Sequence, residues 1–204
     1  MHISEGILSV PVLTTGAAIT AIGTAIGLKQ LDGEKIMTTA LLTATFFVAS
    51  LIHVPLGPAS IHLVLSGLMG ITLGWMCFPA ILVALFLQVL FFQYGGFTSL
   101  GTNTANMALP AIFCFYLFRP FLIAKNTSPI SRNLAGFFSG FCAIFLGTLF
   151  LSLSLGLSDS GFWAAAKLTF ISYIPLMIVE GFITLFAINF LMKVQPEFLY
   201  SSKK

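Results

Sequence analysis

The feature that most constrains this chain is a long stretch without charge. No charged residue stands between Lys35 and Arg119, and the apolar runs there do not alternate with polar residues. Soluble domains carry charge on about a quarter of their residues, whereas this chain is 58% hydrophobic and 7% charged. In lipid, backbone polar groups are satisfied only by helices or closed barrels, and barrel strands alternate. We therefore expect an all-α membrane protein.

The apolar runs divide into about seven helices. A membrane-spanning helix needs about 20 apolar residues. The predicted spans cover residues 7–28, 36–52, two short segments within 59–92 that divide near Cys77, and then 104–122, 133–157 and 167–192. The two short segments could instead form one long kinked helix. We expect a single transmembrane, metal-binding domain over residues 1–204. Residues 1–8 hold no Lys or Arg, so no cleavable signal peptide is expected.

Cationic residues predict how the chain is oriented. Cytoplasmic segments of membrane proteins are enriched in Lys and Arg. With seven spans and the N-terminus outside, eight of the nine cationic residues become cytoplasmic and only Lys167 lies outside. The eight are Lys29, Lys35, Arg119, Lys125, Arg132, Lys193, Lys203 and Lys204. This arrangement puts the C-terminus in the cytoplasm, and it brings residues 1–6, 53–58 and 95–103 to the outer face.

The first two residues can bind a metal ion. Met1 and His2 together offer an α-amine, a backbone amide nitrogen and an imidazole. These three nitrogens close two small chelate rings, and one further His would complete a four-coordinate plane. Such nitrogen sites suit Ni(II), Cu(II) or low-spin Co(II), whereas Mg(II) and Ca(II) prefer oxygen. The alternative is that Met1 is only the initiator and that His2 has no special role.

His62 is the candidate for the fourth nitrogen. It is placed at the outer end of the third predicted span, and an ionisable residue inside a membrane segment indicates function. It could instead be structural, bonded to a backbone carbonyl. His53 is a competing ligand or a supporting residue. Ligating imidazoles donate their second N–H to a neighbour, and Ser60, Thr98 and Asn103 are candidates for that support.

Two further features each allow two interpretations. Glu180 is the only acid deep in a predicted span. It serves either as a proton or ion site or as a structural residue that holds helices together by hydrogen bonding. Small residues four apart permit close helix packing in lipid, either inside the bundle or against a partner subunit. These pairs are Gly23 and Gly27, Gly70 and Gly74, and Gly136 and Gly140.

The sequence argues against most enzymes. It has no phosphate-binding loop of the Gly-Lys-Ser/Thr type, so any ATP used in transport is hydrolysed by another protein. An intramembrane hydrolase built on Ser60 and a His is an alternative, but no nucleophile elbow or third member accompanies it. A metal permease that works without ATP is a second alternative. Nothing in the chain indicates nucleic-acid binding.

Four segments resemble one family. The chain resembles CbiM/NikM proteins, which are substrate-binding membrane subunits of energy-coupling-factor transporters for cobalt and nickel. The matching segments are Met1-His2-Ile3 with Glu5 and Gly6, Ser60 to Leu63, Gln88 with Gly95 to Met107, and Ile174-Pro175 with Glu180-Gly181 and Pro196 to Leu199. The resemblance extends over nearly the whole chain.

The resemblance implies a transporter subunit in a bacterial or archaeal cytoplasmic membrane. Its metal would lie in a square plane of nitrogens from Met1, His2 and His62, under a lid formed by residues 95–103, including Gly95 and Gly96. The expected partners are a membrane scaffold subunit, two ATPase subunits and a small accessory membrane subunit. No cofactor is expected beyond the transported Co(II) or Ni(II). The residues do not separate the two metals, and the Ser4-Glu5-Gly6 start favours cobalt weakly.

Overall fold

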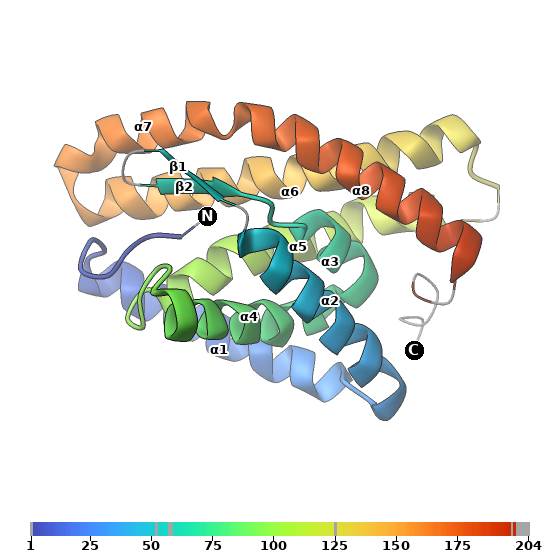
Figure 1. Ribbon diagram of the computed structural model, residues 1–204, viewed down its shortest axis with the longest axis horizontal. Helices are drawn as coiled ribbons and strands as arrows, with labels where there is room; N and C mark the ends of the chain where they lie inside the picture. The colour runs from blue at the N-terminus through green and yellow to red at the C-terminus, as the bar shows by residue number, and fades with distance from the viewer. Residues whose placement is uncertain (1, 52, 57–58, 125, 197, 199–204) are drawn as a thin grey trace.

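Helices make up most of the computed structural model, which describes residues 2–51, 53–56, 59–124, 126–196 and 198, without the side chains of 53–56 and 59–61. Figure 1 shows the helices lying along one long axis, with a small hairpin among them. The elements are α1 (Val10–Gln30), α2 (Gly33–Leu51), β1 (His53–Leu56), β2 (Ala59–His62), α3 (Ser66–Leu73), η1 (Gly74–Met76), α4 (Cys77–Phe92), α5 (Leu100–Ile123), α6 (Pro129–Ser158), η2 (Ser160–Phe162), α7 (Trp163–Ser172) and α8 (Ile174–Val194).

Among the described residues, six helical segments are long and apolar enough to cross a membrane. They cover Val10–Gln30, Gly33–Leu51, Ser66–Phe92, Leu100–Ile123, Pro129–Ser158 and Ser160–Val194. Large apolar side chains such as Met37, Phe91 and Phe186 point out of the bundle, as lipid-facing residues do. The prediction of a helical, multi-pass membrane protein is confirmed.

Proline and serine residues set several helix ends. Pro11 lies in the first turn of α1, where its missing N–H costs little. Ser128 caps α6 by accepting a hydrogen bond from the Ser131 N–H, with Pro129 at the first position. At Tyr173 the chain passes from α7 to α8, two residues before Pro175. The span predicted over residues 167–192 is therefore interrupted just before Pro175.

The third span differs from its prediction. Residues 59–62 form strand β2, which pairs antiparallel with β1, and helix α3 has only eight residues. Eight residues rise about 12 Å, less than half of a bilayer core of about 30 Å. The prediction that helix begins at Ala59 is wrong, because the backbone of residues 59–62 finds its hydrogen-bond partners in β1 rather than within a helix.

Helices α3 and α4 nevertheless run in opposite directions. A Cβ on Gly70 would lie 2.2 Å from the Ala111 carbonyl oxygen, and one on Gly74 would lie 3.1 Å from the Phe115 ring, so α3 runs parallel to α5. Gly74 then adopts a φ of 55°, which favours glycine. Next, the Cys77 thiol packs on the Ala108 carbonyl as α4 returns. The apolar segment 66–92 therefore reverses direction near Gly74, with the short helix α3 leading away from the hairpin and α4 returning beside α5.

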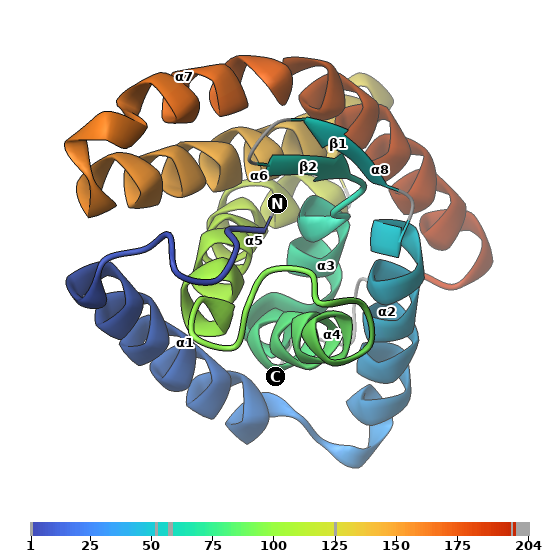
Figure 2. The same cartoon turned by 60° about the vertical axis from the view of Figure 1, so that its left-hand side comes forward.

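This path gathers three segments at one end of the bundle. The N-terminal residues, the β1–β2 hairpin and the loop before α5 lie together in both views (Figures 1 and 2). The connection between α1 and α2 and that between α5 and α6 lie toward the opposite end (Figure 1). The expectation that residues 2–6, the hairpin and the loop share one face is thus met.

Close glycine contacts hold the helices together. A Cβ on Gly27 would lie 2.4 Å from the Trp75 carbonyl oxygen, and one on Gly140 would lie 2.4 Å from the Glu180 carbonyl oxygen. Gly23 likewise packs on the Phe78 ring. Of the two interpretations of the small-residue pairs, packing within the bundle is the one that these contacts support.

Substitution of these glycines tests the packing. We expect Gly70→Ala to lower the free energy of unfolding by about 1–3 kcal/mol, because the Ala111 backbone cannot move aside as a flexible side chain can. Gly136→Ala is the matched control, since its nearest non-local neighbour would lie at 3.4 Å, an ordinary contact. The measurement is thermal unfolding in detergent, and equal melting temperatures for the two variants would contradict this account.

Candidate metal centre

The N-terminal segment is held inside the bundle by side chains of α5 and of the loop before it. The Ile3 N–H donates to Asn103 Oδ1 at 2.9 Å, and the Ile3 carbonyl accepts from Asn103 Nδ2 at 3.1 Å and from Ser99 Oγ at 2.8 Å. The Ile3 side chain is 2% exposed. An amide side chain thus pairs with both polar groups of one backbone residue, as a neighbouring strand would, and this pairing fixes the position of residue 2.

His2 is buried against His62. Their ring centres lie 4.8 Å apart, with 20° between the ring planes. The two residues are 7% and 2% exposed. Tyr94, from the loop before α5, places its ring 6.3 Å from that of His2. The fold therefore brings together two of the imidazoles proposed from the sequence.

A contact with the backbone of the next residue orients the His62 ring. Its Nδ1 atom lies 2.9 Å from the Leu63 carbonyl oxygen. A carbonyl only accepts hydrogen bonds, so Nδ1 is the donor in this contact and carries the proton. His62 is the last residue of β2 rather than part of a helix.

The loop of residues 93–99 packs against the N-terminal segment. A Cβ on Gly96 would lie 1.8 Å from Glu5 Oε2, and the Thr98 N–H donates to Glu5 Oε1 at 3.3 Å. Gly95 has a φ of 80°, and a Cβ there would lie 3.7 Å from the His2 Cβ. Asn103 lies on α5, because that helix begins at Leu100 rather than at residue 104 as predicted. The loop is therefore shorter than expected and covers His2.

Three of the predicted residues are only partly described. Met1 lies outside the described residues, and so do the side chains of His53 and Ser60. The backbone of His53 pairs with that of His62 across the hairpin, and that of Ser60 pairs with Pro55. In the part of the chain that the structure describes, no three His, Cys, Asp or Glu side chains gather. A metal bound at His2 and His62 would need further ligands from the backbone or the chain terminus.

Glu180 and Ser99 contribute more than the sequence indicated. Glu180 is fully buried on α8 and accepts hydrogen bonds from the backbone N–H groups of Val64 and Leu65. Of the two interpretations of Glu180, these contacts support the structural role, in which its hydrogen bonds hold neighbouring segments together. Ser99 precedes α5 and binds Ile3, whereas the sequence indicated it only as part of the lid of residues 95–103. The sequence feature that could have indicated this contact is the position of Ser99 in a loop just before an apolar helix.

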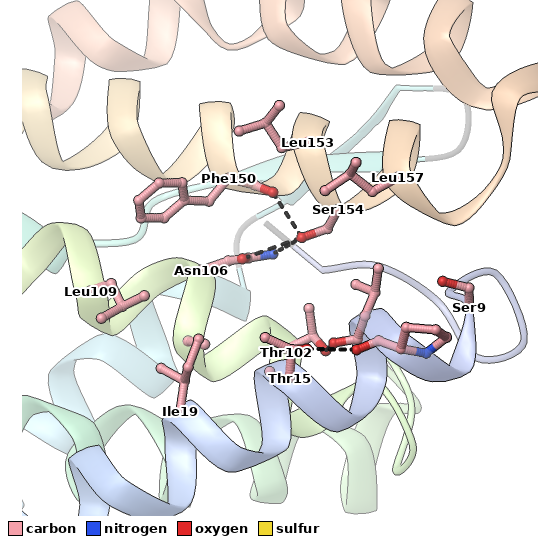
Figure 3. A pocket seen from close by; sticks show the side chains of 14 residues that line it. Ser9, Thr15, Ile19, Thr102, Asn106, Leu109, Phe150, Leu153, Ser154 and Leu157 are labelled. Carbon is pink, nitrogen blue, oxygen red and sulfur yellow. Dashed lines mark hydrogen bonds between the residues drawn. The ribbon is translucent and has the colours of Figure 1, made fainter.

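A separate groove of about 550 Å³ lies between α1, α5 and α6 (Figure 3). Its walls are mostly apolar, and Asn106 and Ser154 meet within it, with 3.3 Å between Asn106 Nδ2 and Ser154 Oγ. Neither His2 nor His62 lines the groove. Asn106 thus faces a different surface from Asn103, although both belong to the same helix.

Comparison with known proteins decides the family. The model of the family described as "Cobalt uptake substrate-specific transmembrane region" (CbiM) matches residues 2–198. The chain belongs to the CbiM family. This membership agrees with the resemblance that the sequence motifs gave.

Relatives of this CbiM chain are named for metal transport. A Haemophilus influenzae protein named for metal transport is 42% identical, over 97% of this chain and 96% of its own length. An Archaeoglobus fulgidus protein named for fused nickel transport, NikMN, is 28% identical, over 97% of this chain and 67% of its own. A crystal structure described as a transition metal transporter superposes with a TM-score of 0.82 at 26% identity, covering 100% of this chain and 98% of that one.

The contacts of Asn103 can be tested by hydrogen exchange. We expect Asn103→Leu to speed exchange of the Ile3 amide by roughly tenfold or more, because a buried N–H left unpaired costs about 1–3 kcal/mol. Asn106→Leu is the matched control, since it removes an equally buried amide from the same helix without touching Ile3. Mass spectrometry of the N-terminal peptide gives the measurement, and unchanged exchange in Asn103→Leu would contradict the proposed pinning.

Proposed function

We propose that this chain binds Co(II) or Ni(II) as the substrate-specific subunit of an uptake transporter. The observation that carries the proposal is the burial of His2 against His62 at the end of a pinned N-terminal segment. Membership of the CbiM family supports the same substrate class. The metal ion is the transported substrate and not a resident cofactor.

The proposed site is a square of four nitrogens. The Met1 amine, the His2 amide nitrogen and the His2 imidazole occupy three consecutive corners, because they belong to two fused chelate rings. His62 Nε2 takes the fourth corner, next to the His2 imidazole. With metal–nitrogen distances of about 2.0–2.1 Å, two rings on neighbouring corners have centres roughly 4.5 Å apart. The 4.8 Å between the His2 and His62 ring centres is close to this spacing.

Selection then follows from geometry. A planar nitrogen site suits Ni(II) and low-spin Co(II) and penalises Zn(II), which prefers a tetrahedron. Cu(II) fits the same plane, so its exclusion depends on its availability in the cell. The loop of residues 93–99 serves as the lid, because it packs on both His2 and Glu5.

Transport itself requires partner subunits. We propose an energy-coupling-factor assembly with a membrane scaffold, two ATPases and a small accessory membrane subunit, and with the N-terminus of this chain outside the cell. The fused NikMN relative, in which a matching segment makes up 67% of the protein, supports the presence of further components. The alternative is a permease that works without ATP. Metal uptake that persists in cells lacking the partner ATPases would favour that alternative.

Metal titration of the purified chain tests the site. We expect His62→Ala, or one Gly added before Met1, to weaken Ni(II) and Co(II) binding by at least 100-fold. Each change takes away one of the four proposed nitrogen ligands. His53→Ala should have a smaller effect. Isothermal titration calorimetry of protein with an untagged N-terminus gives the affinities, and one Gly added after Lys204 is the control for the extension. Unchanged affinity after either site change would rule out this arrangement.

A further inference from the structure

Glu180 accepts hydrogen bonds from the backbone of the short segment that joins His62 to α3. Its carboxylate accepts from the Val64 N–H, and from the Leu65 N–H at 3.0 Å and 3.1 Å to its two oxygens. Glu180 is fully buried, and Leu65 adopts a left-handed φ of 52°. A buried carboxylate is costly unless it is hydrogen-bonded, so the two N–H groups and the carboxylate stabilise one another.

The position of these bonds is not that of an ordinary helix cap. A capping side chain accepts from the second or third residue of the helix, which in α3 would be Gly67 or Leu68. Glu180 instead binds residues that precede the helix, and it approaches from α8. The carboxylate therefore holds the segment after His62 rather than the first turn of α3.

One peptide group connects Glu180 to His62. The Leu63 carbonyl, which receives the His62 Nδ1 hydrogen bond at 2.9 Å, belongs to the same peptide as the Val64 N–H. A peptide group is planar, and its C=O and N–H point to opposite sides. Fixing the N–H on Glu180 therefore aims the C=O at the His62 ring. The hydrogen bond to the Glu180 side chain also polarises the peptide and strengthens its carbonyl as an acceptor.

We propose that Glu180 is a positioning residue for the metal ligand His62. Acting through the 63–64 peptide, it holds the proton on Nδ1 and fixes the orientation of the ring beside His2. The role in metal binding rests on the proposed function, whereas the control of the His62 ring does not. Hydrogen-bond partners of ligating imidazoles typically change metal affinity by about 10–100-fold when they are removed.

The protonation of His62 tests the proposal without metal. The chain has three His residues, so ¹⁵N NMR of histidine-labelled, metal-free protein resolves them, with His62→Ala giving the assignment. We expect the proton on Nδ1 in the unaltered protein and a shift toward Nε2 in Glu180→Gln. A role limited to stability would not move this equilibrium. A proton on Nε2 in the unaltered protein would overturn the proposal, whatever the variants do.

Metal binding supplies the second test. We expect Glu180→Gln to weaken Ni(II) binding by about tenfold or more and to shift the absorption bands of the bound metal. Glu180→Asp, which keeps the charge but is one methylene shorter, should weaken binding as well. Thr184→Val is the matched control, because this buried residue lies one turn further along α8 and its hydroxyl has no partner among the described residues. Its affinity should stay within twofold.

The two hypotheses fail in different ways. Unaltered protein that binds no Ni(II) would contradict the proposed function, while the NMR result would still decide the role of Glu180. Glu180→Gln with unchanged affinity, absorption and His62 protonation would overturn the positioning role, even if its melting temperature fell.

Discussion

The arrangement of the candidate site depends on the hydrogen bonds between Asn103 and the backbone of Ile3. A chain terminus is ordinarily free to fray, and here a side-chain amide pairs with both the N–H and the carbonyl of residue 3. Ser99 adds a second donor to that carbonyl. These bonds are made where water is scarce, so leaving them unmade is costly. They keep His2 beside His62 while the loop before α5 folds over it.

A second group of polar contacts supports the site from the opposite side. Glu180 on α8 binds the backbone between β2 and α3, and α3 itself packs on α5 and α6 through Gly70 and Gly67. The hairpin, the short helix and the buried acid therefore form one unit. A hairpin and a short helix take the place of a full spanning helix here. As a result, the His62 imidazole lies beside the N-terminal segment.

Much of this was available from the sequence. The uncharged stretch between Lys35 and Arg119 predicted the membrane bundle. Met1 and His2 were singled out by their nitrogen atoms, and His62 by its place at the end of a predicted span. The hairpin was missed because residues 59–62 carry no Asp, Glu, Lys or Arg and lead directly into the apolar run that follows, and a short segment of this kind does not distinguish a strand from a helix. The start of α5 was placed four residues late, because its polar first turn resembles a loop. The partner of Glu180 could not be predicted, since it is a backbone amide, and any residue type supplies one.

The contact between Glu5 and Gly96 has a consequence for protein engineering and for sequence variation. No side chain fits at position 96 while Glu5 keeps its place, because even a Cβ would overlap the carboxylate. Positions 5 and 96 therefore form a compatibility pair. In a chimera that takes this loop from one relative and its first residues from another, a side chain at 96 would displace the Glu5 carboxylate, and a shorter residue at 5 would relieve the overlap.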